Sequence, residues 1–150
     1  MTNNQITIRP YHAATDLKPL STIWLDASRI AHAFIGIERL LEQQHLIEEQ
    51  YLPNAQTSVA CLSGKPVGFI SLLDTFIGGI FVSPHHQGKG IGRALIAHAL
   101  AEKGELTLEV YAENGQAMRF YQGLGFVELS RREVDDSGLP FANVRMGVRG

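Results

Sequence analysis

The feature that most constrains the fold is a junction in the middle of the chain. An apolar run, TFIGGIFV, covers residues 75–82, and the segment HHQGKGIG that soon follows holds three glycines within five positions. From Ile91 onward, apolar residues such as Leu95 and Ile96 recur at helical spacing. A nearly all-apolar run predicts a central strand, because both faces of such a strand are buried. The chain must therefore pass from a buried strand into a helix through a loop of unusual backbone freedom.

Hydrophobic periodicity elsewhere predicts strands and helices in alternation, with a hairpin at the end. The predicted strands cover residues 5–9, 57–62, 66–73, 75–82, 105–111, 126–134 and 141–148. Helices are predicted from Thr15, capped by Thr15 or Asp16, from about Ile37 to Pro53, from Ile91, and over 115–125. No repeat or linker interrupts the 150 residues, so we expect one domain, residues 1–150, with a mixed sheet covered by helices.

Composition excludes several classes of protein. The net charge of −2 argues against a broad surface for nucleic acid or membranes, because such a surface is usually basic. No segment reaches the roughly 18 apolar residues of a membrane helix, and the N-terminus lacks the apolar core of a signal peptide. A single cysteine, Cys61, excludes an internal disulfide. We therefore expect a cytoplasmic protein, without a metal site, because no metal-ligand spacing occurs.

The glycine-rich segment fits neither of two common nucleotide-binding loops. A Walker A loop needs Ser or Thr after Gly-Lys, but one Gly-Lys pair here precedes glycine and the other precedes proline. The dinucleotide fingerprint fails because its third glycine position is occupied by Arg93. What remains is Gln87-x-x-Gly90-x-Gly92 between a strand and a helix. Free amides at a helix start, with Lys89 and Arg93 nearby, predict a cradle for phosphate groups.

This motif resembles the coenzyme A pyrophosphate motif of the GNAT superfamily of N-acetyltransferases. The segment VYAENGQAMRFYQGLGF, residues 110–126, is similar to the second signature of that superfamily. SRIAHAFI at 28–35 and SRREVDDSGLPF at 130–141 resemble the branch of small bacterial proteins of the YjaB and YiaC type. The resemblance implies an α/β (α+β) GNAT fold: a mixed, mostly antiparallel, splayed sheet of about seven strands with helices on both faces. It also implies acetyl-CoA as donor and an amine as acceptor, and it allows a homodimer.

The resemblance further assigns residues to the coenzyme. Main-chain groups of the central strand would contact the pantetheine arm, the glycine loop would hold the pyrophosphate, and Asn114 would bond the arm or cap a helix. Tyr121 would assist departure of the thiolate as the catalytic acid. The coenzyme-binding residues expected are Ile80, Phe81, Val82, Gln87, Gly88, Lys89, Gly90, Ile91, Gly92, Arg93, Asn114 and Tyr121.

Two glycines inside the central strand, Gly78 and Gly79, predict a bulge or a close approach of backbone. An amide there would hold the oxyanion of the tetrahedral intermediate; the alternative is a bent strand without a role. Candidates for the base are Glu109, Asp74 and His32, and no spacing selects one. His32, Phe34 and Phe76 are candidates for the acceptor pocket, with packing roles as the alternative.

These observations predict an N-acetyltransferase in which the amine attacks acetyl-CoA directly. The acceptor is a protein lysine, a protein N-terminus or a small-molecule amine. A non-catalytic module that binds acyl-CoA on the same fold is the alternative. Acetylation of aminoacyl-tRNA is a third option, which the absence of a basic run in the sequence disfavours.

Overall fold

The computed structural model describes residues 5–31, 33–135 and 138–150, which form a seven-stranded sheet and four α-helices. The strands are β1 (Ile6–Pro10), β2 (Gln56–Leu62), β3 (Lys65–Leu73), β4 (Phe76–Val82), β5 (Glu105–Tyr111), β6 (Val127–Arg132) and β7 (Asn143–Arg149). The helices are α1 (Ala13–Ala31), α2 (Ile37–Leu46), α3 (Ile91–Lys103) and α4 (Gly115–Gly123), with short turns η1 (Ala33–Ile35), η2 (Ile47–Tyr51) and η3 (Pro84–His86).

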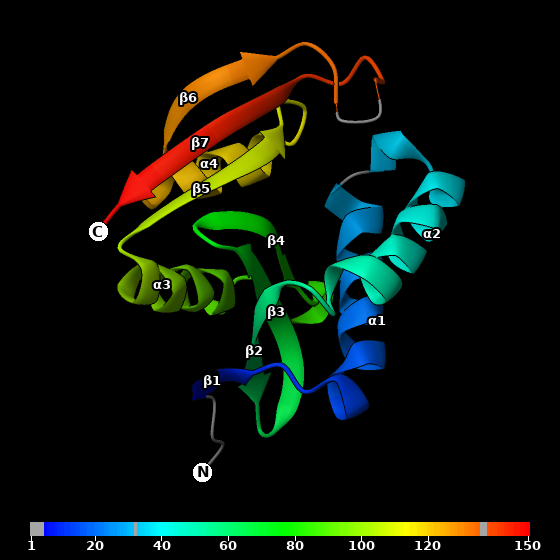
Figure 1. The fold of residues 1–150 in the computed structure, drawn as a ribbon, viewed down its shortest axis with the longest axis vertical. Helices are drawn as coiled ribbons and strands as arrows, with labels where there is room; N and C mark the ends of the chain where they lie inside the picture. The colour runs from blue at the N-terminus through cyan, green and yellow to red at the C-terminus, as the bar shows by residue number, and fades with distance from the viewer. Residues whose placement is uncertain (1–4, 32, 136–137) are drawn as a thin grey trace.

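The sheet has the order β1-β2-β3-β4-β5-β7-β6, and every neighbouring pair is antiparallel except β4 and β5. The parallel pair has only two residue pairings, Phe76 with Thr107 and Ile77 with Leu108. Beyond these pairings the two strands separate, so Figure 1 shows a lower β1–β4 part and an upper β5–β7 part. The predicted splayed, mixed sheet is therefore confirmed.

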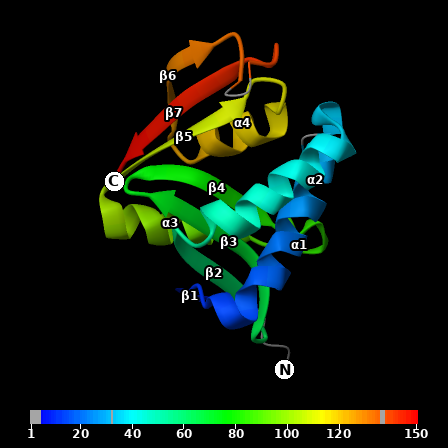
Figure 2. The same cartoon turned by 45° about the vertical axis from the view of Figure 1, so that its right-hand side comes forward.

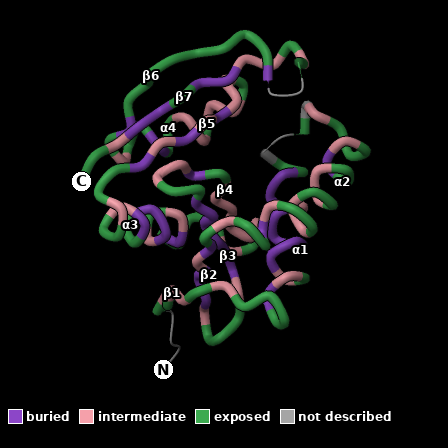
Figure 3. Tube along the Cα trace, viewed as in Figure 1, coloured by how far each residue is buried: buried purple, intermediate pink, exposed green. Residues whose placement is uncertain are grey.

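Helices cover both faces of the sheet, as predicted. α1 packs over β3 and β4 on one face, and α2 packs against α1 (Figure 2); Leu20, Trp24 and Phe69 share a core there. On the other face, residues of α3 and α4 share a second core with β4, β5 and β7. Figure 3 shows these buried segments, and it shows β6 exposed along its length. Because the two cores lie on opposite faces of the sheet, the place where β4 and β5 separate has helices on both faces.

β4 carries the predicted bulge. Its register against β3 shifts near the start of the strand: Ile77 lies opposite Leu72 and Gly79 lies opposite Ser71, which leaves Gly78 without an opposing residue. Gly78 is also exposed, although its strand is central in the sheet. The bulge therefore coincides with the point at which β5 leaves β4.

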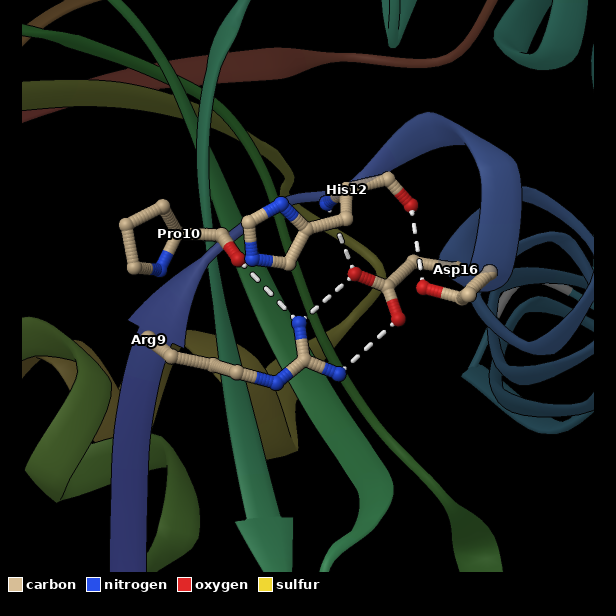
Figure 4. A network of polar contacts seen from close by, with 5 residues as sticks. Arg9, Pro10, His12 and Asp16 are labelled. Atoms are coloured by element: carbon tan, nitrogen blue, oxygen red, sulfur yellow. Dashed lines mark hydrogen bonds and ion pairs between the residues drawn. The ribbon is translucent and has the colours of Figure 1, made fainter.

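The start of α1 depends on a buried carboxylate (Figure 4). Asp16, only 1 % exposed, accepts the His12 amide at 2.8 Å and two bonds from the Arg9 guanidinium at 2.7 and 2.9 Å. The Arg9 bonds hold the pKa of Asp16 below its ordinary value of 3.8. Because Asp16 bonds backward along the chain, the helix begins at Ala13, and the predicted start at Thr15 is wrong by two residues.

Candidate active site

The glycine loop between β4 and α3 adopts the backbone conformation that its sequence predicts. Gly88 and Gly90 both have φ near 80°, a region that side chains strongly disfavour. Gly92 has a different role, since its φ is not positive. A Cβ at this position would lie 3.1 Å from Cζ of Phe120, so Gly92 lets the start of α3 approach α4 closely. Two glycines thus shape the loop, and the third brings α4 beside it.

The loop presents free donors and free positive charge. The first helical bond of α3 runs from the Ala94 amide to the Gly90 carbonyl at 3.0 Å, so the helix does not use the amides before it. Gly90, the residue before the helix, has no side chain with which to cap these amides. Lys89 and Arg93 are exposed and form no ion pair with any residue in the described ranges. This arrangement suits a diphosphate.

One edge of β4 is open along the path from this loop to the bulge. Ile80, Phe81 and Val82 pair with Ile70, Phe69 and Gly68 of β3, whereas their other edge has no pairing with β5 in the described structure. Amide and carbonyl groups on an unpaired edge need partners. A ligand with amide groups of its own, such as pantetheine, meets that need.

Tyr121 lies in the core shared by α3 and α4. Its ring packs against Phe120 and Phe126 at centroid distances of 5.3 and 5.5 Å, and 9 % of the residue is exposed. Burial raises the pKa of its hydroxyl, which therefore stays protonated at neutral pH. Among the described residues no group is hydrogen-bonded to it. Tyr121 thus holds a neutral donor that no described residue uses.

Asn114 caps α4, the plainer of the two roles expected for it. Its Oδ1 accepts the Ala117 amide at 3.1 Å. The cap uses only the oxygen of the side-chain amide, so the NH₂ group keeps both of its donors. Asn114 can therefore fix the start of α4 and still offer a hydrogen bond to a ligand.

A cavity of about 260 Å³ lies between α1, α2 and the end of β5, on the opposite face of the sheet from Tyr121. Ser28 is 1 % exposed, and its Oγ has no hydrogen-bond partner in the described part of the chain. Since a buried hydroxyl is normally bonded, Ser28 is a group that a ligand can satisfy. The described residues that line the cavity carry no charge; they are Trp24, Ser28, Gln43, Leu46, Ile47 and Tyr111. The sequence does not reveal it, because its lining comes from three distant segments.

Of the three residues expected in the acceptor pocket, the structure describes the side chain of Phe76 alone. His32 lies outside the described residues, and the structure does not describe the Phe34 side chain. The Phe76 ring, half-buried at the start of β4, has the Arg145 guanidinium 5.6 Å above it and does not line the cavity.

The candidate bases are not brought together. Glu109 accepts a bond from Arg132 at 2.8 Å and lies 3.7 Å from Arg145, so its charge is already compensated. Asp74 is exposed in the turn between β3 and β4, with φ of 57°. Neither carboxylate reaches the lining of the cavity.

The described ranges contain neither a metal-binding cluster nor a membrane helix. Residues 5–31, 33–135 and 138–150 contain no group of three His, Cys, Asp or Glu side chains arranged to hold a metal ion. Over the same ranges, no helix has both the length and the apolar character needed to cross a membrane.

Comparison with known proteins defines the class. Residues 53–128 match the family model described as the acetyltransferase (GNAT) domain, a span that includes β4, the glycine loop, α3, β5 and α4. The chain belongs to the GNAT acetyltransferase family. It is an acyltransferase that moves an acetyl group from acetyl-CoA to an amine.

Individual relatives cover nearly the same length. The chain is 36 % identical over 132 residues to the peptidyl-lysine N-acetyltransferase YjaB of Escherichia coli K12, covering 87 % of this chain and 89 % of YjaB. It is 33 % identical over 127 residues to the peptidyl-lysine N-acetyltransferase YiaC of the same organism, covering 84 % and 87 %. The solution structure of apo YjaB from Escherichia coli superposes with a TM-score of 0.86 at 34 % identity, over 95 % and 97 % of the two chains. The predicted resemblance to this branch is confirmed.

Proposed function

We propose that this protein acetylates lysine side chains of other proteins by direct attack of the amine on acetyl-CoA. The observation that carries the proposal is the open edge of β4, which connects the cationic glycine loop to the exposed bulge at Gly78. The pyrophosphate binds the loop amides with Lys89 and Arg93, and pantetheine bonds residues 80–82. The names of YjaB and YiaC support a lysine acceptor. The reaction takes place in the cytoplasm, where acetyl-CoA is available.

Bond changes in this reaction are simple. The amine nitrogen forms a bond to the thioester carbon, and the C–S bond breaks with its electrons moving to sulfur. An amide of the bulge stabilises the oxyanion that forms between these steps. The amine proton passes to water, since neither candidate carboxylate, Glu109 or Asp74, is among the described residues that line the cavity between α1 and α2.

Tyr121 stabilises the leaving sulfur in this mechanism. Ordinary pKa values of about 10 for tyrosine and about 8.5 for a thiol make full proton transfer uphill by roughly 2 kcal/mol. Burial raises the pKa of Tyr121, and the same dry surroundings raise that of the thiol. A hydrogen bond from the neutral hydroxyl to the developing thiolate is therefore sufficient. Tyr121 keeps its proton, and the thiolate takes a proton from solvent as CoA leaves.

The Tyr121→Phe variant tests this role. The substitution keeps the ring that packs between Phe120 and Phe126 and removes the donor. We expect turnover to fall at least tenfold while calorimetry gives an unchanged dissociation constant for CoA. Turnover is measured as release of the CoA thiol. Unchanged turnover would remove Tyr121 from the chemistry, and lost CoA binding would mean that the variant perturbs the fold.

Peptide acceptors test the substrate class and the non-catalytic alternative together. One peptide carries lysine behind a blocked N-terminus, and its control carries arginine in place of lysine. A third peptide has a free N-terminus and no lysine. We expect thiol release with the first peptide alone. Release with the third alone would reassign the acceptor to the α-amine, and CoA binding without release for any amine would favour a sensing module.

A further inference from the structure

Tyr51 carries a buried hydroxyl that nothing in the described structure uses. Its OH is shielded from solvent and has no hydrogen-bond partner among the described residues. Burial raises the pKa of this phenol, so the group is neutral at physiological pH. A buried hydroxyl without a partner is uncommon and destabilising. A ligand group can supply the partner that this hydroxyl lacks.

The local backbone positions this hydroxyl in a specific way. α2 does not simply end at Leu46, since residues 47–51 continue as a π-helical turn, η2, closed by a bond of 2.9 Å from the Leu52 amide to the Ile47 carbonyl. π-Helical turns inside or beside α-helices are frequent at functional sites. The wider turn changes the direction in which Tyr51 projects from the helix.

The Tyr51 hydroxyl projects onto the bulge of β4. It occupies the position that a Cβ of Gly78 would fill, so any larger residue at Gly78 would displace it. Gly78 is the unpaired residue of the bulge and is exposed where β5 diverges. Tyr51 therefore contacts the backbone at the place assigned above to the reacting thioester.

The turn that carries Tyr51 also reaches the cavity between α1, α2 and the end of β5. Ile47, at the other end of η2, lines that cavity. Trp24, which also lines it, packs at 6.2 Å against Phe81 of β4. η2 thus contributes Ile47 to the cavity and Tyr51 to the bulge, on the face of the sheet that α1 covers.

We propose that the Tyr51 hydroxyl contacts the incoming amine and accepts a hydrogen bond from it, which orients the nitrogen lone pair toward the thioester carbon at the bulge. This proposal rests on the proposed function. The described lining of the cavity is uncharged and favours a neutral amine, and a neutral hydroxyl suits such a nucleophile. Tyr51 retains its own proton throughout, while the amine proton passes to water and Tyr121 serves the sulfur.

The Tyr51→Phe variant tests the proposal, with Tyr11→Phe as the matched control. Tyr11 is also half-buried with a raised pKa, but it lies near Asp16 at the start of α1. We expect Tyr51→Phe to lower kcat for the blocked lysine peptide at least fivefold and to leave the KM for acetyl-CoA within twofold. We also expect its Tm to be equal to or above that of the wild type, because an unsatisfied buried hydroxyl is removed. Tyr11→Phe should keep the kcat of the wild type.

The outcomes separate this proposal from the proposed function. An unchanged kcat in Tyr51→Phe, beside an active wild type, overturns the role of Tyr51 alone. A lowered Tm in Tyr51→Phe means that the hydroxyl is structural, and this result also overturns it. A wild type that binds acetyl-CoA and releases no CoA with any amine overturns the proposed function and this inference with it.

Discussion

Asp16 illustrates how much a single residue contributes at the N-terminal end of α1. Arg9 is about one-third exposed and can be hydrated without a partner, whereas Asp16 is almost fully buried. The carboxylate contributes stability above its unfolded pKa, near 3.8, because its pKa is lowered in the folded protein. That contribution is lost as the pH falls through the folded-state pKa. The ion pair therefore stabilises the protein at neutral pH, and this stabilisation is lost in acid.

Asp16→Asn should lower the free energy of unfolding at pH 7 by about 2 kcal/mol, since the Arg9 guanidinium then faces a neutral amide instead of a carboxylate. The asparagine oxygen still accepts one bond. Urea unfolding should show the difference from wild type shrinking below about pH 4, where the carboxylate of the unfolded wild type begins to be protonated.

Glu105→Gln supplies the control for this prediction. Glu105 lies 3.4 Å from Arg149 in a pair that is largely exposed on both sides. We expect Glu105→Gln to change the free energy of unfolding by less than about 0.5 kcal/mol at any pH, because surface ion pairs contribute little. A pH-independent deficit in Asp16→Asn would show that packing, not charge, accounts for the loss.

At the scale of elements, the loop before α3 depends on backbone conformation rather than on side-chain contacts. A Cβ on Gly90 would meet nothing within 4 Å, so the φ of 80° is the whole constraint at this residue. Gly90→Ala should lower the free energy of unfolding by about 1 kcal/mol and weaken CoA binding severalfold, because alanine favours negative φ. Urea unfolding and calorimetry measure the two effects.

Gly123→Ala is the matched glycine control. Gly123 is the last residue of α4, also has open space around it, and does not have a positive φ. Alanine should leave stability equal or slightly higher there. Equal effects of the two substitutions would contradict the conformational argument.

Elements were predictable where their signal is local. Strict alternation gave β5 its bounds, 105–111, and the glycine spacing gave the loop and the start of α3 at Ile91. The start of α1 was not predictable in this way, because Asp16 bonds Arg9 and His12, which precede it, and does not cap amides that follow it. The backbone freedom expected of the glycine loop is used at Gly88 and Gly90 but not at Gly92, which is needed for the contact with Phe120 of α4.

The residues on the α1–α2 side of the site were less predictable, because their positions depend on contacts between distant segments. Tyr51 and Ser28 follow apolar helical patterns, and nothing near them in sequence signals an unsatisfied hydroxyl. Tyr51 acquires its position from a π-helical turn and from Gly78, which lies 27 residues away in sequence. Such sites depend on tertiary packing, which periodicity does not encode.

At the scale of the whole molecule, the sheet consists of two parts joined by little backbone pairing. Only two residue pairs link β4 to β5, beside a bond of 3.0 Å from the Thr107 amide to the Thr75 carbonyl. A coenzyme lodged in the separation contacts both parts. Binding should therefore stabilise the junction more than the interior of either part.

Hydrogen exchange with and without acetyl-CoA tests this expectation. Amides of residues 79–82 that face away from β3 should exchange at least tenfold more slowly when the coenzyme is bound, because pantetheine occupies their open edge. Amides between β1 and β2 serve as the internal control and should change only as global stability changes. Equal slowing at both places would contradict binding along β4.

The single cysteine has a practical consequence for assays of this enzyme. Cys61 is 2 % exposed within β2, so the folded protein presents no thiol to a chromogenic disulfide reagent, and colour in such an assay counts liberated coenzyme alone. Unfolding makes the same sulfur reactive. One reagent can thus report catalysis in native buffer and, as denaturant is added, the opening of the β1–β4 part of the molecule.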